Sequence, residues 1–90
     1  MNQTSAILLL IGLSIVLIGH YVRQKSLLAK GWEADNTAPY IRLLIINGGL
    51  LMVFSIMALI TYDWPYGLMG ILLFIEASVC FAFAKKLRNK

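Results

Sequence analysis

Residues 66–84, YGLMGILLFIEASVCFAFA, form a long apolar stretch whose only charged side chain is Glu76. A helix needs about 20 predominantly apolar residues to cross the hydrocarbon layer of a membrane, which is about 30 Å thick. Because backbone N–H and C=O groups cannot stay unpaired in lipid, a stretch of this length and composition is expected to be α-helical. The segment therefore predicts a transmembrane helix.

Two stretches nearer the N-terminus have the same character. Residues 5–22, SAILLLIGLSIVLIGHYV, carry no Asp, Glu, Lys or Arg, and residues 40–62 contain strongly polar side chains only at Arg42 and Asn47. In the whole chain, 60% of residues are hydrophobic and 13% are charged, whereas about 25% are charged in an ordinary soluble domain. We therefore expect an all-α integral membrane protein with three transmembrane helices in one small bundle.

The connections between these helices differ in length. Residues 23–39, RQKSLLAKGWEADNTAP, form either a basic loop or a helical extension that lies at the lipid headgroups and ends near Gly31. The second connection is a turn at residues 63–65, so short that the helices on either side are expected to be antiparallel neighbours. Pro39 and Pro65 suit the first turns of the helices that follow these connections. Residues 85–90 form a basic tail.

The basic residues predict the orientation. All eight Lys and Arg residues fall in or beside the first connection or in the C-terminal tail, which are on the same side of a three-span arrangement. Positively charged connections stay in the cytoplasm, so the N-terminus is expected outside and the C-terminus inside, in the inner membrane of a bacterium. The amphipathic side chains expected at the membrane interfaces are His20, Tyr21, Trp32, Tyr40, Tyr62, Trp64 and Tyr66.

Each predicted helix has a stripe of small or polar residues, which is typical of helix contacts in membranes. On the first helix the stripe recurs every seven residues. The packing residues predicted from these stripes are Ser5, Gly12 and Gly19 on the first helix, Asn47, Leu51, Ser55 and Ala58 with the adjoining Gly48 and Gly49 on the second, and Gly70, Leu73, Ala77, Cys80 and Ala84 on the third.

Glu76 is the main candidate for a functional residue, because a carboxylate inside the hydrocarbon costs several kcal/mol and is expected to face the bundle interior. Its partners can be ranked by counting the helical rise from the nearest basic residue. Ser14 comes out at the level of Glu76, Asn47 somewhat nearer the cytoplasm, and His20 only about 5 Å from the inner boundary. Glu76 is therefore predicted either to hold helices together, with Ser14 or Asn47, or to bind a proton or cation.

Other classes of site are not indicated. The chain has no cluster of metal ligands, no nucleophile–base pair, no phosphate-binding loop and a single cysteine, Cys80. We expect no enzyme activity, metal or cofactor and no nucleic-acid partner. The expected partners are the lipid bilayer and either further copies of the chain or a larger membrane protein.

Residues 75–90, IEASVCFAFAKKLRNK, resemble the last helix of the small three-span subunit shared by respiratory complex I and multisubunit sodium/proton antiporters. The acid-Ala-Ser opening and the basic end carry this resemblance, which implies a role in ion coupling. The family also has an acid in its second helix, where this chain has Asn47, so the chain is not assigned to it. The topology and basic tail are similar to those of three-span phage holins, without a shared motif.

Three functions follow as expectations. The first is a non-enzymatic accessory, regulatory or immunity-type membrane protein that acts through helix contacts. The second is a proton- or cation-coupling subunit of a transporter that uses Glu76. The third is a holin-like pore-forming protein.

Overall fold

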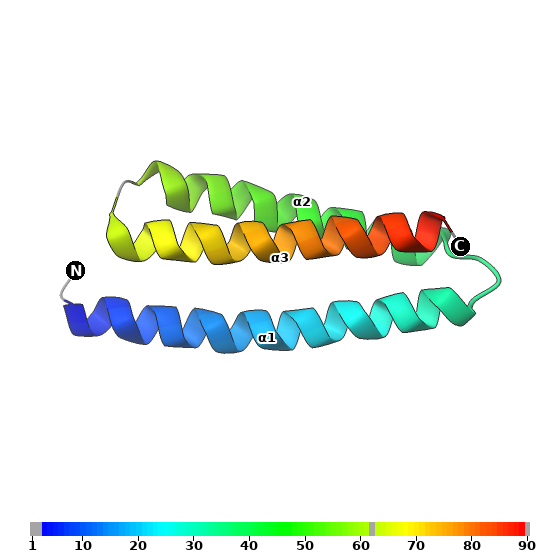
Figure 1. The fold of residues 1–90 in the computed structure, drawn as a ribbon, viewed down its shortest axis with the longest axis horizontal. Helices are drawn as coiled ribbons and strands as arrows, with labels where there is room; N and C mark the ends of the chain where they lie inside the picture. The colour runs from blue at the N-terminus through cyan, green and yellow to red at the C-terminus, as the bar shows by residue number, and fades with distance from the viewer. Residues whose placement is uncertain (1–2, 62, 90) are drawn as a thin grey trace.

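The computed structural model describes residues 3–61 and 63–89, which form three α-helices: α1 (Gln3–Glu33), α2 (Ala38–Ile60) and α3 (Trp64–Arg88). The all-helical prediction is confirmed, and each helix is long and apolar enough to cross a membrane. The helices lie side by side in an elongated bundle of 51 × 22 × 14 Å, with the first helix ending near the beginning of the second (Figure 1).

Proline and short polar side chains mark where α2 and α3 begin. Pro39 and Pro65 lie in the first turns, where a missing N–H breaks no helical hydrogen bond. The Asn36 side-chain oxygen accepts a hydrogen bond from the backbone N–H of Ala38 at 3.2 Å. Asp63 occupies the N-cap position of α3 without a side-chain cap bond. Its backbone carbonyl accepts a hydrogen bond from Gly67 at 2.8 Å.

The first helix is longer than a single membrane span requires. α1 continues without a break through Arg23 and past Gly31 to Glu33, so most of the expected loop 23–39 is helical and the connection to α2 is only 34–37. The prediction that Gly31 ends this helix is wrong; the glycine instead lies inside it. The second connection is 61–63 rather than 63–65, because α3 already begins at Trp64.

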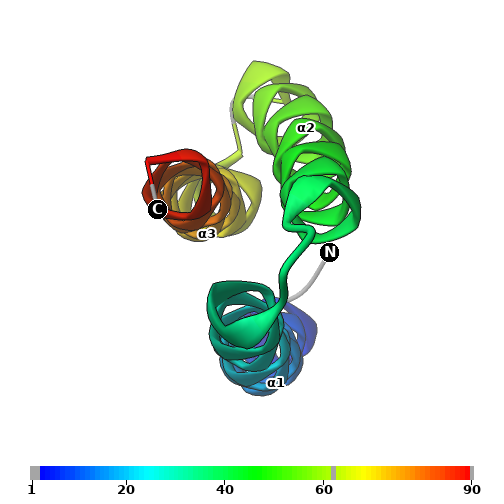
Figure 2. The same cartoon turned by 90° about the vertical axis from the view of Figure 1, so that its right-hand side faces the viewer.

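Helices α2 and α3 form a tightly packed antiparallel hairpin, as the short link between them predicts (Figures 1 and 2). Glycines permit this close approach. A Cβ at Gly70 would lie 2.7 Å from Leu59 Cγ, and a Cβ at Gly48 would lie 3.1 Å from Cys80 Cβ. The Ser55 hydroxyl donates a hydrogen bond to the Gly70 carbonyl at 2.7 Å. The predicted stripe on α3 is the face that α2 covers, and Gly70, Ala77, Cys80 and Ala84 are all buried.

α1 lies against this hairpin mainly through α3, to which it runs parallel (Figures 1 and 2). His20 of α1 contacts Glu76 of α3, 56 positions later in the sequence. The same separation relates Gly31 to Leu87, where a Cβ at Gly31 would lie 2.9 Å from Leu87 Cδ1. The two helices are therefore in register over several turns, with each residue of α1 level with the residue 56 positions later.

The face of α1 that packs is not the predicted one. The buried residues of α1 are Ala6, Leu17, Gln24 and Gly31. The last three again recur every seven residues, whereas Ala6 lies eleven residues before Leu17. A Cβ at Gly12 or Gly19 would meet no atom of the described chain within 4 Å beyond its own turns of helix. The same holds for Gly49 of α2. The covered stripe also has a seven-residue period, but at about 100° per residue it lies on nearly the opposite side of α1 from Gly12 and Gly19.

Much of the remaining surface is apolar. Only a small share of the most apolar 18-residue stretch of each helix is buried: 11% in α1, 17% in α2 and 28% in α3. Exposed aliphatic side chains such as Ile15, Ile18 and Val53 are more than half accessible. Single exposed apolar residues are normal, but contiguous apolar surface on this scale indicates contact with lipid or with another protein.

Candidate functional site

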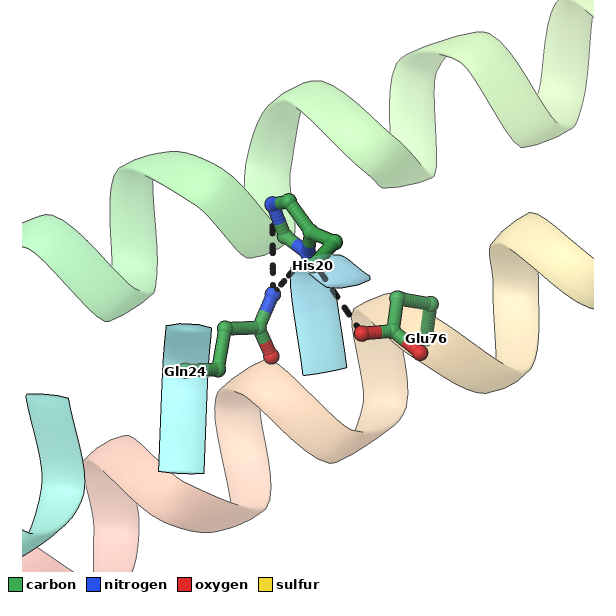
Figure 3. A network of polar contacts seen from close by, with 3 residues as sticks. All are labelled: His20, Gln24 and Glu76. Atoms are coloured by element: carbon green, nitrogen blue, oxygen red, sulfur yellow. Dashed lines mark hydrogen bonds and ion pairs between the residues drawn. The ribbon is translucent and has the colours of Figure 1, made fainter. Parts of the chain in front are cut away.

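Glu76 and His20 form the central polar contact between α3 and α1. The His20 Nδ1 atom lies 3.4 Å from Glu76 Oε1, and the two side chains are 21% and 10% exposed. Figure 3 shows the imidazole and the carboxyl group pointing toward each other from the two helices. An acid within an apolar helix is thus paired inside the chain, which is how buried carboxyl groups avoid an uncompensated desolvation cost.

Gln24 extends this contact by one helical turn. Its side-chain amide lies on the imidazole of His20, and Nε2 contacts both ring nitrogens (Figure 3). Gln24 is fully buried. Cys80 is 56 positions later, so it is level with Gln24 in the register set by His20 and Glu76, and it is also buried. We call these three residues, His20, Gln24 and Glu76, the polar latch.

The imidazole nitrogen Nδ1 faces both a carboxyl group and an amide. When Gln24 donates its N–H to Nδ1, that nitrogen carries no proton, and Glu76 can bond to it only by donating a proton of its own. When Nδ1 carries the proton, it donates it to the Glu76 carboxylate instead. The position of one proton therefore decides which hydrogen bonds the polar latch contains.

The ranking of partners for Glu76 by depth is wrong. Ser14 donates its hydroxyl to the Leu10 carbonyl of its own helix at 2.8 Å. Asn47 does not bond to Glu76 either, and its Nδ2 atom is buried without a hydrogen-bond partner. His20, predicted as an interfacial residue, is the residue that contacts Glu76.

The error comes from the choice of Arg23 as the inner boundary on α1. In the register of α1 and α3, Lys85 is level with Ala29, so Arg23 lies six residues, or about 9 Å, further from that end of the bundle than Lys85. A long arginine side chain can extend toward polar surroundings from such a position. Depths counted from Arg23 and from Lys85 are therefore not on the same scale.

Sequence reasoning missed Gln24 altogether. It was assigned to the polar connection because it stands between Arg23 and Lys25. Its spacing could have identified it: Gln24 is seven residues after Leu17 and seven before Gly31, and all three are buried. This period continues across the expected end of the helix.

Four of the predicted interfacial aromatic residues, Trp32, Tyr40, Trp64 and Tyr66, lie toward the two ends of the bundle. Trp32 and Tyr40 are on either side of the first connection, and Trp64 and Tyr66 begin α3 at the opposite end. Trp32 and Trp64 are exposed. Tyr21 instead lies near the middle of α1, eleven residues before Trp32, and its ring is 6.0 Å from that of Phe83. Tyr62 lies outside the described residues.

A groove of about 300 Å³ runs between α1 and α3 beside Glu76. It is open on one side. Apart from Glu76 and Ser14, its lining is aliphatic or aromatic, with Leu17, Ile18 and Tyr21 on α1 and Leu72 and Ile75 on α3. The groove thus joins one carboxyl group to an otherwise apolar wall.

Among the described residues, no group of three or more His, Cys, Asp and Glu side chains is placed to hold a metal ion. The chain matches no protein-family model, and neither a curated protein nor a solved structure matches it. The fold and the site define a class only: a small all-α protein of three helices, each of membrane-crossing length, in which polar contacts join the first helix to a tight hairpin.

Proposed function

We propose that the protein is a non-enzymatic membrane protein of three spans that acts through helix contacts, as an accessory, regulatory or immunity-type subunit of a larger membrane protein. The observation that carries this proposal is the division of α1 into two faces. One face is held to α3 by the polar latch and Gly31. Another carries Gly12 and Gly19 with open space above them.

Small residues let helix backbones approach closely in a membrane, where van der Waals packing and interhelical hydrogen bonds drive association. Gly12 and Gly19 are two turns apart on one side of α1, and Ser26 continues the same stripe seven residues later. A helix of another protein can therefore lie along this side. The glycine face of α1, defined by Gly12 and Gly19, is the proposed partner surface.

The proposed orientation has the N-terminus outside and the C-terminus in the cytoplasm of a bacterial inner membrane. The basic residues support it, because those of α1 lie in its last third, Arg42 is near the beginning of α2, and Lys85, Lys86 and Arg88 are in the last turn of α3. These segments meet at the same end of the bundle (Figure 1). A tag placed after Lys90 is expected to be protected from impermeant reagents in intact cells; labelling from outside would contradict the orientation.

The partner interaction is tested by purification in a mild native detergent. The full chain is expected to co-purify with a larger membrane protein at a defined stoichiometry, and the double substitution Gly12→Leu and Gly19→Leu is expected to abolish this. Neither leucine meets an obstacle within the chain at its Cβ, so the variant is expected to keep its helical content, which circular dichroism checks.

The matched control is Gly49→Leu together with Gly67→Leu, two substitutions at glycines that also have open space above them but lie on α2 and α3. These are expected to leave the partner bound. If the α1 variant retains the partner in the wild-type amount, the glycine face is not the partner surface. If the chain purifies alone or only as large pores of itself, the accessory role is wrong.

A second candidate function is proton or cation coupling, and the contact of His20 with Glu76 favours it. A carboxyl group and an imidazole in contact inside an apolar bundle are a pair through which a proton can be taken up and released. Reconstituted protein would then carry an ion flux that depends on pH and that Glu76→Gln abolishes. Vesicles that stay impermeable to protons and monovalent cations with the wild-type chain would exclude this candidate.

A further inference from the structure

The groove beside Glu76 combines two properties that are seldom found together in an apolar bundle. Its walls are almost entirely aliphatic or aromatic, and it contains one carboxyl group, that of Glu76. An apolar neutral molecule would offer the carboxyl group no opposite charge, and a small hydrated ion would leave the apolar walls facing water. A molecule with an apolar body and one positive charge satisfies both.

We propose that this groove binds an apolar organic cation, such as a quaternary ammonium ion or a protonated hydrophobic amine, with Glu76 as its counter-ion. The cation lies between α1 and α3, with its apolar groups against Ile18 and Leu72 and its charge toward the carboxylate. Tyr21, at the same groove, offers an aromatic face, to which organic cations are attracted.

The test is calorimetric titration of the full chain in detergent with benzyltrimethylammonium, whose charge does not change with pH. Glu76→Gln is expected to weaken binding about tenfold or more, because the cation loses its counter-ion. Glu33→Gln, at an exposed acid on α1 outside the groove, is expected to have no effect.

Two results would overturn the proposal: equal binding by Glu76→Gln, or equal binding of the neutral isostere neopentylbenzene. If Glu76→Gln does not fold, Ile18→Trp serves instead, because it fills the groove while keeping the acid; undiminished binding by that variant would equally overturn the proposal.

This inference does not depend on the proposed partner interaction. At about 100° per residue, Gly12 and Gly19 lie on roughly the opposite side of α1 from Ser14, Ile18 and Tyr21. The variant with leucine at both glycines is therefore expected to bind the cation normally. Loss of the partner without loss of the cation, or the reverse, shows which proposal has failed.

Discussion

Gly31 of α1 lies directly against Leu87 of α3, and a Cβ on this glycine would come within 2.9 Å of Leu87 Cδ1 and 3.0 Å of Tyr40 Cβ. Eleven residues earlier on the same side of α1, His20 contacts Glu76. A close backbone approach and a polar contact, each between residues 56 positions apart, together determine both the register and the rotation of α1. Neither contact alone could do so, because a helix held at one point can still turn about its axis.

The polar latch is expected to contribute measurably to stability. Interhelical hydrogen bonds in membranes contribute about 0.6 kcal/mol on average and up to about 1.7 kcal/mol. A double-mutant cycle of His20→Leu and Glu76→Leu, measured by reversible unfolding in detergent, should give a coupling energy in this range. Glu76→Gln should lose less stability than Glu76→Leu, because an amide can still bond to the imidazole. Strictly additive effects of the two leucine substitutions would show that the contact between His20 and Glu76 contributes nothing to stability.

Gly70 and Gly67 form a matched pair for testing the α2–α3 contact. Gly70→Ala places a methyl group 2.7 Å from Leu59 Cγ and 3.1 Å from the Ser55 carbonyl oxygen. It should destabilise the hairpin by about 1–3 kcal/mol, the usual cost of overpacking. Gly67→Ala meets open space and should be neutral or stabilising by about 0.5–1 kcal/mol, because alanine favours the helix. Thermal unfolding compares the two, and an equal response would contradict the close approach at Gly70.

Ser55 and Ser78 test whether a hydroxyl acts between helices or within one. The Ser55 hydroxyl donates across to Gly70 of α3, whereas that of Ser78 donates to Phe74 of its own helix at 3.0 Å and is exposed. Ser55→Ala should therefore lower the free energy of unfolding by about 0.6 kcal/mol, while Ser78→Ala should change it by less than about 0.5 kcal/mol. The reverse order would mean that the interhelical bond is not made in solution.

Asn47→Leu is expected to stabilise the protein. The Asn47 Nδ2 atom is buried without a hydrogen-bond partner, and a buried donor without a partner costs about 1–3 kcal/mol. A leucine of similar size should recover about 1 kcal/mol of this, measured by unfolding in detergent. Asn47→Ala removes the amide and also most of the side-chain volume, so comparing its free energy of unfolding with that of Asn47→Leu separates the effect of volume from that of polarity. Destabilisation by both substitutions would indicate that Asn47 bonds to another chain, such as a partner subunit.

Much of the fold is predictable from the sequence because apolar length and helix-breaking residues are local properties. Pro39 and Pro65 lie in the first turns of α2 and α3 as expected. The packed face of α3 is also predictable, because small residues mark it. Gly70, Ala77 and Ala84 are all buried in a helix that contacts both others.

The partner of Glu76 was not predictable in the same way. Two helices that are far apart in the sequence can slide past each other without any change in local pattern. Counting from Arg23 gave Ser14, whereas the register of α1 and α3 gives His20. The counting failed because α1 continues to Glu33 and has no boundary at Arg23.

By itself, the sequence determined that the chain forms three long apolar helices, with a tight turn that pairs the last two and a single acid within the third. Only the tertiary structure decided which face of α1 is covered and what Glu76 contacts. Two stripes with the same seven-residue period run along α1, one through Gly12 and Gly19 and the other through Leu17, Gln24 and Gly31. The free energy of burying Glu76 against His20 depends on how α1 is rotated, and this rotation is a property of two helices together that the pattern of neither one contains.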